Sequence, residues 1–154
     1  MISTILVATD GSKTARKGAL YAVELAKQLK ATVIALSVID NRSFMGETGM
    51  GQTVPASESA RHVIEPLADY LKESAEGYVG DIKKLCKKKG VPSKTIITAG
   101  HPVEDIVNEA SKVKANLIIM GSHGRSALAA AVIGSVTYGV IHRETKIPVL
   151  IVKN

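Results

Sequence analysis

The sequence predicts a single α/β domain built on a parallel, doubly wound sheet, and three observations lead to that fold class. Short apolar runs rich in β-branched residues alternate with segments of helical periodicity along the chain, which is the order that a parallel sheet requires. No internal repeat or linker interrupts this alternation. A length of 154 residues, a hydrophobic fraction of 45% and a charged fraction of 22% are typical of one globular domain with its own core.

The first strand, the first helix and the second strand follow one another closely. Residues 2–8 form an apolar run, as expected of a strand that is buried on both faces. Asp10-Gly11-Ser12 then breaks the run and offers a helix N-cap. Residues 31–39 form the second buried strand. Between these strands, apolar residues recur at spacings of four and three along one helix face: Ala15, Ala19, Ala22, Ala26 and Leu29.

A long loop and a long helix occupy the middle of the chain. Residues 40–57 lack periodicity and contain several glycines and a proline, which predicts a surface loop. Apolar side chains then keep helical spacing from Leu67 to Leu85 and include Tyr78, so a long helix is expected there. Residues that are expected to bend or weaken this helix are Pro66, Gly77 and Gly80.

The last third of the chain repeats the alternation. Pro102 stands at the first position of the helix after the third strand, where proline is favoured. A loop punctuated by glycines runs to Gly134, and a short helix covers 135–144. Strands are predicted at 94–100, 115–121 and 148–152. In a sheet of this kind, ligands bind at the carboxyl ends of the strands, where the strand order reverses.

Composition and charge narrow the class of partner. Aromatic residues make up 3% of the chain and tryptophan is absent, which argues against a protein that stacks single-stranded nucleic acid on aromatic rings. The net charge of +6 suits an anionic partner. The densest basic group, from Lys83 to Lys89, stands near the end of the long predicted helix, where the helix dipole favours cations. We therefore favour a solvated helix end over a nucleic-acid patch.

Cysteine content and hydropathy indicate the cellular compartment of the protein. Cys86 is the only cysteine, so neither an intramolecular disulfide nor a cysteine metal cluster can form, and it is expected on the buried face of the long helix. No run of about 18 apolar residues is present to span a membrane. The N-terminal residues lack the basic leader of a signal peptide. We expect a cytoplasmic protein that does not engage membranes.

The sequence contains two glycine arrays that are candidates for a phosphate-binding loop. Residues 46–53, GETGMGQT, match the P-loop pattern G-x-x-x-x-G-K-[ST] except that Gln52 replaces the lysine. A P-loop directly follows a strand and opens a helix. This array instead begins several residues after the second strand and runs into Pro55, which disfavours a helical conformation at Val54. We therefore reject residues 46–53 as a P-loop.

The second array, MGSHGRSALAAAVIGSVT, meets the requirements that the first one fails. Gly121 ends an apolar strand, and Gly124 leaves room for backbone N–H groups to face an anion. Gly134-Ser135 begins the next helix with Ser135 as the expected N-cap, so the positive end of the helix dipole would meet a phosphate. Arg125 adds a permanent positive charge. Hydroxyl groups come from Ser122, Ser126, Ser135 and Thr137.

The spacing of these glycines resembles a known signature. Gly121-x2-Gly124-x9-Gly134-Ser135 is similar to G-x2-G-x9-G-[ST] of the universal stress protein family, in its ATP-binding branch. The resemblance extends over nearly the whole chain through TDGS, SVID, MGSHG and the closing PVLIVK. It implies one universal stress protein domain over residues 1–154, with a Rossmann-like fold. Its five-stranded parallel sheet would have the order 3-2-1-4-5 and carry helices on both faces.

The resemblance also implies where each part of a nucleotide would lie. Ala8, Thr9 and Asp10 would lie beside the nucleotide, and Asp10 would contact the phosphates or a bound Mg²⁺ or Mn²⁺. The backbone of Val38 would meet the adenine, and Ala8 departs from relatives that carry proline or a bulkier residue. Met120 and Gly121 would flank the ribose. The phosphates would be enclosed by Gly121, Ser122, His123, Gly124, Arg125, Ser126, Ala127, Gly134, Ser135, Val136 and Thr137.

Several of these residues allow another interpretation. One alternative is that Asp10 caps a helix and has no other role, although we favour its role as a ligand. His123 is interpreted as a polar wall or a hydrogen-bond donor and not as a catalyst. The other histidines lack a partner at metal-ligand spacing and are expected on the surface: His62, His101 and His142.

The favoured function is an ATP-binding regulatory or stress-response protein, in which the nucleotide sets the conformation or the choice of a protein partner. Hydrolysis would be slow or absent, because no residue is an evident activator of water. One alternative is an ATP pyrophosphatase or adenylyltransferase, which would carry SGGxDS or HxGH where this chain has ATDGSK. Another is a nucleotide-free scaffold, against which the glycine signature counts. The resemblance further implies a homodimer through antiparallel pairing of residues 148–152 at a sheet edge.

Overall fold

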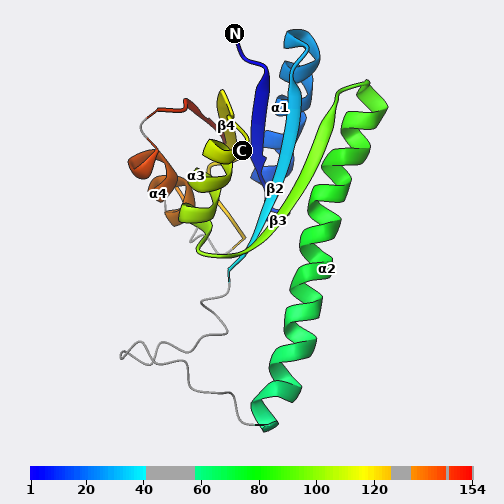
Figure 1. The fold of residues 1–154 in the computed structure, drawn as a ribbon, viewed down its shortest axis with the longest axis vertical. Helices are drawn as coiled ribbons and strands as arrows, with labels where there is room; N and C mark the ends of the chain where they lie inside the picture. The colour runs from blue at the N-terminus through cyan, green and yellow to red at the C-terminus, as the bar shows by residue number, and fades with distance from the viewer. Residues whose placement is uncertain (41–57, 126–132, 145, 154) are drawn as a thin grey trace.

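The described part of the chain is an open sheet with helices on both faces (Figure 1). The computed structural model describes residues 1–40, 58–125, 133–144 and 146–153. The sheet has five strands in the order β3-β2-β1-β4-β5, and all neighbouring pairs are parallel. The predicted fold class and strand order are therefore confirmed. The strands are β1 (Thr4–Ala8), β2 (Thr32–Asp40), β3 (Ser93–Gly100), β4 (Leu117–Gly121) and β5 (Val149–Val152).

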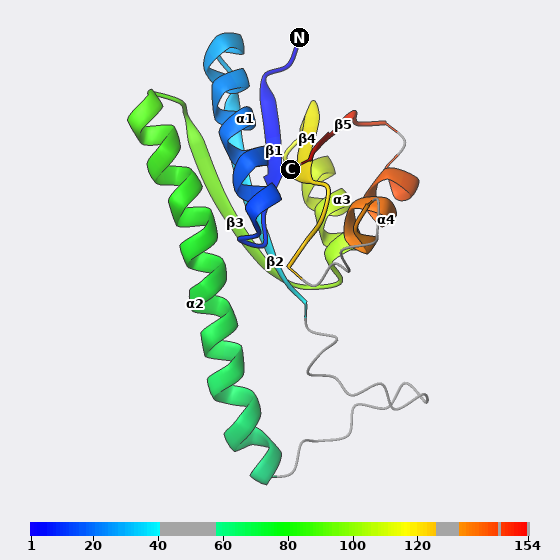
Figure 2. The same ribbon diagram turned by 180° about the vertical axis from the view of Figure 1, so that it is seen from behind.

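Each face of the sheet is covered by a pair of helices (Figure 1 and Figure 2). The first two helices pack on one face and the last two on the other. Apart from those of the long helix, the observed strand and helix boundaries agree with the predicted ones to within two residues, a difference that is common where element ends fray. The helices are α1 (Lys13–Leu29), α2 (Glu58–Lys89), α3 (Pro102–Lys112) and α4 (Ser135–Arg143).

The two faces of the sheet carry separate apolar clusters. Ile5 and Val7 of β1 belong to the cluster under α1 and α2, whereas Leu6 and Ala8 belong to the cluster under α3 and α4. This division follows from the alternation of side chains along a strand. Because β1 is central and contributes to both clusters, its carboxyl end is held firmly, and residues that follow it start from a fixed position.

Helix α2 is longer than the sequence predicted. It begins at Glu58, well before Leu67, and continues through Pro66, Gly77 and Gly80 to Lys89. Its central and C-terminal parts lie along the sheet, and its N-terminal part extends beyond the sheet (Figure 1). The buried face that anchors it is formed by Ala75, Val79, Ile82 and Cys86. This burial stabilises the helix across residues that locally disfavour it.

Some predictions fall on residues outside the described ranges. They are the loop over 40–57, apart from Asp40 at the end of β2, and with it the rejected P-loop at 46–53. Ser126 and Ala127 of the second glycine array also lie outside the described ranges. Among the helices in the described part of the chain, none is long and apolar enough to cross a membrane.

Candidate functional site

The carboxyl ends of β1 and β4 form the switch point of the sheet. From β1 the chain adds β2 and β3 on one side, and β4 and β5 then extend the sheet on the other side. β1 and β4 pair directly, with Ile5 opposite Leu117 and Val7 opposite Ile119. The turns that follow these two strands therefore lie side by side, at the place where ligands of such sheets bind.

Asp10 joins the two turns through its carboxylate. Its Oδ1 accepts a hydrogen bond from the Ser12 backbone N–H at 3.0 Å, and its Oδ2 accepts one from the Arg125 backbone N–H at 2.8 Å. The N-cap of α1 is Ser12, whose Oγ accepts from the Ala15 N–H at 3.2 Å. The interpretation of Asp10 as the helix cap is therefore wrong. Its carboxylate instead lies half-buried between the ends of β1 and β4.

Gly121 allows the end of β4 to pack against the start of α1. A Cβ at this position would lie 2.5 Å from Thr14 Oγ1 and 2.7 Å from the Ala15 backbone nitrogen. Such distances are far below van der Waals contact, so a side chain would force the two elements apart. The hydroxyl of Thr14 donates to the carbonyl of His123, which binds the turn after β4 to α1.

Gly134 brings the start of α4 against the same turn. Its N–H donates to the Ser122 carbonyl at 2.7 Å, and a Cβ there would lie 3.3 Å from His123 Cα and 3.5 Å from the Gly124 nitrogen. The N-cap of α4 is Gly134 itself, so the prediction of Ser135 as the cap is wrong. The reason is the bond to Ser122, which fixes the chain one residue before Ser135. The first N–H groups of α4 have no partner within the helix.

Two of the predicted hydroxyl ligands are used within the protein. The buried Thr137 donates from Oγ1 to the Gly121 carbonyl at 2.8 Å. Ser122 Oγ, also buried, lies 2.9 Å from Nδ1 of His123 in a shared hydrogen bond. These side chains hold the turn after β4 in shape. Ser135 is exposed at the start of α4 and can reach an approaching ligand.

The residues assigned to the adenosine lie on the α3 and α4 side of the sheet. Ala8 and Met120 belong to the buried cluster of that face, and Val38 packs against it. Thr9 is buried as well, and its N–H donates to the Leu36 carbonyl at 2.9 Å. Since these side chains are largely covered, a nucleotide would contact them chiefly through backbone atoms.

Arg125 points toward α2. Its Nη1 donates to the hydroxyl of Tyr78 at 2.6 Å, and its guanidinium carbon lies 5.9 Å from the centre of the Tyr78 ring. The helical spacing of the sequence predicted Tyr78 only on the apolar face of a helix and did not indicate this contact. A signal was present, because a tyrosine on such a face needs a partner for its hydroxyl.

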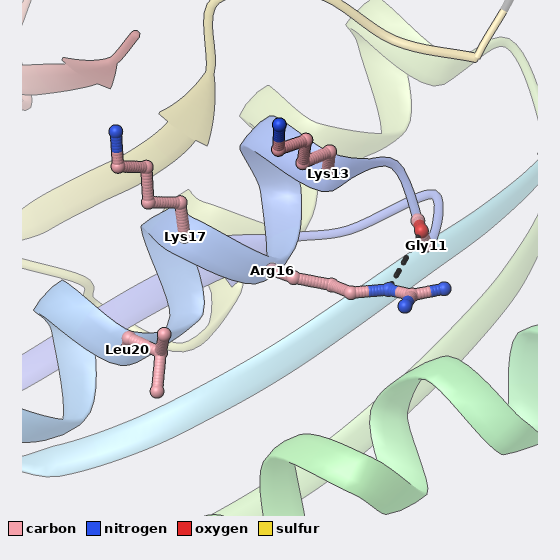
Figure 3. Close-up of a pocket in the computed structure, with 5 residues that line it drawn as sticks. All are labelled: Gly11, Lys13, Arg16, Lys17 and Leu20. Carbon is pink, nitrogen blue, oxygen red and sulfur yellow. Dashed lines mark hydrogen bonds between the residues drawn. The ribbon is translucent and has the colours of Figure 1, made fainter. Parts of the chain in front are cut away.

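The first turns of α1 add positive charge beside the site. A surface depression of about 510 Å³ is lined by Gly11, Lys13, Arg16, Lys17 and Leu20 (Figure 3). Arg16 Nε donates to the Gly11 carbonyl at 3.0 Å, whereas Lys13 and Lys17 extend away from it (Figure 3). The first turn of α1 contains no acidic residue. The positive end of the helix dipole is thus left uncompensated by its own side chains.

The site offers little to a bare metal ion. Among the described residues, no group of three or more His, Cys, Asp or Glu residues could hold a metal. Asp10 supplies a carboxylate whose oxygens each accept one N–H, and each oxygen keeps a second acceptor position. A magnesium-like ion bound by one carboxylate and by phosphate oxygens is compatible with that arrangement.

Comparison with known proteins places the chain among relatives of one kind. The model of the universal stress protein family matches residues 1–153. Universal stress protein MJ0577 of Methanocaldococcus jannaschii is 39% identical over 163 residues, with 99% of this chain and 96% of that protein covered. The solved structure of MJ0577 has a TM-score of 0.77 at 34% identity and covers 100% of this chain and 97% of that one.

Two further solved structures of universal stress proteins share the fold. One, in complex with cAMP, has a TM-score of 0.66 at 24% identity and covers 99% of this chain and 97% of its own. The other, from Archaeoglobus fulgidus and in complex with dAMP, has a TM-score of 0.66 at 20% identity and covers 99% and 98%.

Proposed function

Because the chain belongs to the universal stress protein family over residues 1–153, we propose that it binds ATP where β1 and β4 end. Bound nucleotide would set its conformation or its choice of protein partner in a regulatory or stress-response role. The observation that carries this proposal is the meeting of Gly121, Gly124 and Gly134 around one turn at the switch point. Family members in complex with cAMP and dAMP support an adenine nucleotide as the ligand.

The phosphates would bind at the first turn of α4. The N–H groups of Ser135, Val136 and Thr137 stand at the positive end of that helix, where anions are favoured. The Gly134 bond to the Ser122 carbonyl places this helix end against the turn that includes Gly124. The ribose would then lie by Met120 and Gly121, and the adenine by the backbone of Val38.

We propose that Mg²⁺ or Mn²⁺ accompanies the phosphates at Asp10. When bound, such an ion would neutralise phosphate charge and orient the phosphate chain. Asp10 itself holds the turns after β1 and β4 together. His123 shares its Nδ1 with Ser122, and the remaining acceptor positions of Asp10 would be used by the metal ion. No residue is then left as an evident activator of water, so we expect ATP hydrolysis to be slow or absent.

A homodimer through β5 is part of the proposal. β5 lies at the edge of the sheet, and its Leu150 is 40% exposed. An apolar edge strand invites pairing with another strand, and an antiparallel partner strand across a twofold axis would cover it. Sedimentation should show a dimer at about micromolar concentration and a shift toward monomer in Leu150→Lys. A wild-type protein that sediments as a monomer would refute the proposed homodimer.

Two further predictions have their own tests. Cell fractionation tests the predicted cytoplasmic location, and binding assays test the predicted absence of nucleic-acid binding.

Nucleotide content tests the proposal directly. Freshly purified protein would be denatured and the released small molecules identified by mass spectrometry, and stripped protein would be titrated with ATP and Mg²⁺ by calorimetry. We expect an adenine nucleotide in the first experiment or saturable ATP binding in the second. Absence of both, up to about millimolar ATP, would refute the proposed function.

A further inference from the structure

Tyr78 connects helix α2 to the turn after β4. Its hydroxyl accepts a hydrogen bond from Arg125 Nη1 at 2.6 Å, and the guanidinium lies over its ring. α2 belongs to the face of the sheet opposite α4, so this contact reaches the turn from the side opposite the helix that Gly134 begins. Arg125 is exposed, whereas Tyr78 is half-buried. The tyrosine is therefore the better-held member of the pair.

The ring of Tyr78 is fixed by Gly11. A Cβ on Gly11 would overlap the ring, and Gly11 has a φ of +75°, which favours glycine. The carbonyl of Gly11 is itself held by Arg16 Nε (Figure 3). A ring packed against backbone at this point has little freedom, because Val79 and Ile82 anchor the same part of α2 in the core. The hydroxyl is thus presented from a rigid position.

Arg125 is consequently held at two points. Its backbone N–H is bound by Asp10 Oδ2 at 2.8 Å, and its side chain is bound by Tyr78. A guanidinium has more N–H donors than the one used here, so donors remain for an anion. A free arginine loses much rotamer freedom when it binds a phosphate, and a side chain that is already ordered loses less.

We propose that Tyr78 is a positioning residue for Arg125, which makes helix α2 a determinant of how strongly the site prefers a triphosphate. The inference rests on the proposed nucleotide site. Arg125 follows Gly124 at the far end of the turn from Met120, where the ribose is assigned. Its guanidinium would thus act on the outer phosphates and leave the nucleoside and the first phosphate unaffected. The chemistry recognised is a polyphosphate chain on an adenine nucleoside.

The test compares ATP with AMP in matched variants. Tyr78→Phe removes the hydroxyl and keeps the ring on Gly11, and Tyr70→Phe makes the same change at an exposed position of α2. Dissociation constants for both nucleotides with Mg²⁺ would be measured by calorimetry. We expect Tyr78→Phe to raise the Kd for ATP about fivefold, or about 1 kcal/mol, and to leave that for AMP within about twofold. Tyr70→Phe should change neither.

A double-mutant cycle separates positioning from structural damage. In an Arg125→Ala background, Tyr78→Phe should have no further effect on ATP binding, because the positioned group is gone. Equal losses for ATP and AMP would show a structural role and overturn the inference. Unchanged binding of both nucleotides would also overturn the inference. Tighter ATP binding in Tyr78→Phe would overturn it as well, because it would mean that Tyr78 holds Arg125 away from the phosphates. Failure of the wild type to bind either nucleotide would instead refute the proposed function on which the inference rests.

Discussion

Replacing Gly134 with valine tests the proposed phosphate site where the start of α4 packs against the turn after β4. The φ and ψ angles of Gly134 are −72° and 154°, which valine adopts without strain. The expected effect therefore comes from crowding alone. A Cβ would lie 3.3 Å from the Ser122 carbonyl oxygen and from His123 Cα, and the methyl groups of valine would extend further. The turn after β4 or the start of α4 must then move.

The size of the effect follows from the N–H groups that this movement displaces. Hydrogen bonds to charged oxygens contribute roughly 1.5–3 kcal/mol each. Loss of about two such bonds to the phosphates would lower the affinity for ATP by about two orders of magnitude or more, at about 1.4 kcal/mol per tenfold. Arg125→Ala should cost less, about tenfold, because an exposed charge is screened by solvent and the N–H groups stay in place.

Calorimetric titration with ATP and Mg²⁺ would measure both effects, after circular dichroism has shown that each variant is folded. Gly134→Ala should give an intermediate loss, since it adds only the Cβ. Gly80→Val is a matched control, because a Cβ at Gly80 would meet nothing within 4 Å. If folded Gly134→Val binds ATP as tightly as the wild type, the phosphates do not lie at this helix end and the reasoning fails.

Other substitutions test the remaining structural claims. Gly46→Ala with Gly51→Ala should change ATP affinity by less than about tenfold, and loss of binding in a folded double variant would restore the rejected P-loop. Thr137→Val should lower the free energy of unfolding by about 1–3 kcal/mol in urea titrations, since the Gly121 carbonyl loses the hydrogen bond from the buried Thr137 hydroxyl, and unchanged stability would contradict that role. Burial raises the pKa of the Cys86 thiol above its ordinary value of 9.0. The reactive thiolate is therefore scarce even when the pH of the solution is near 9.0. Iodoacetamide should therefore label Cys86 only after denaturation, and fast labelling of native protein would show that the thiol is accessible.

Local patterns in the sequence were sufficient to predict the architecture of the fold. Apolar runs and helical spacing are properties of neighbouring residues, and so is the helix start at Pro102. The glycine array could also be read locally, since Gly121 and Gly134 stand where a strand ends and a helix begins. The length of α2 could not be predicted locally. Pro66 and Gly77 disfavour a helix, and the tertiary burial of residues such as Val79 and Cys86 overrides that local preference.

Only the tertiary structure decided which polar group meets which. The cap of α4 is Gly134 and not Ser135, because a bond to Ser122 fixes the chain there. Tyr78 and Arg125 lie 47 residues apart in sequence. They meet only because α2 packs on β2 and β3 and brings Tyr78 against Gly11, in the turn after β1. A hydrogen bond between distant segments depends on how whole elements pack. The sequence therefore determines which donors and acceptors exist, and packing of the folded chain determines how they pair.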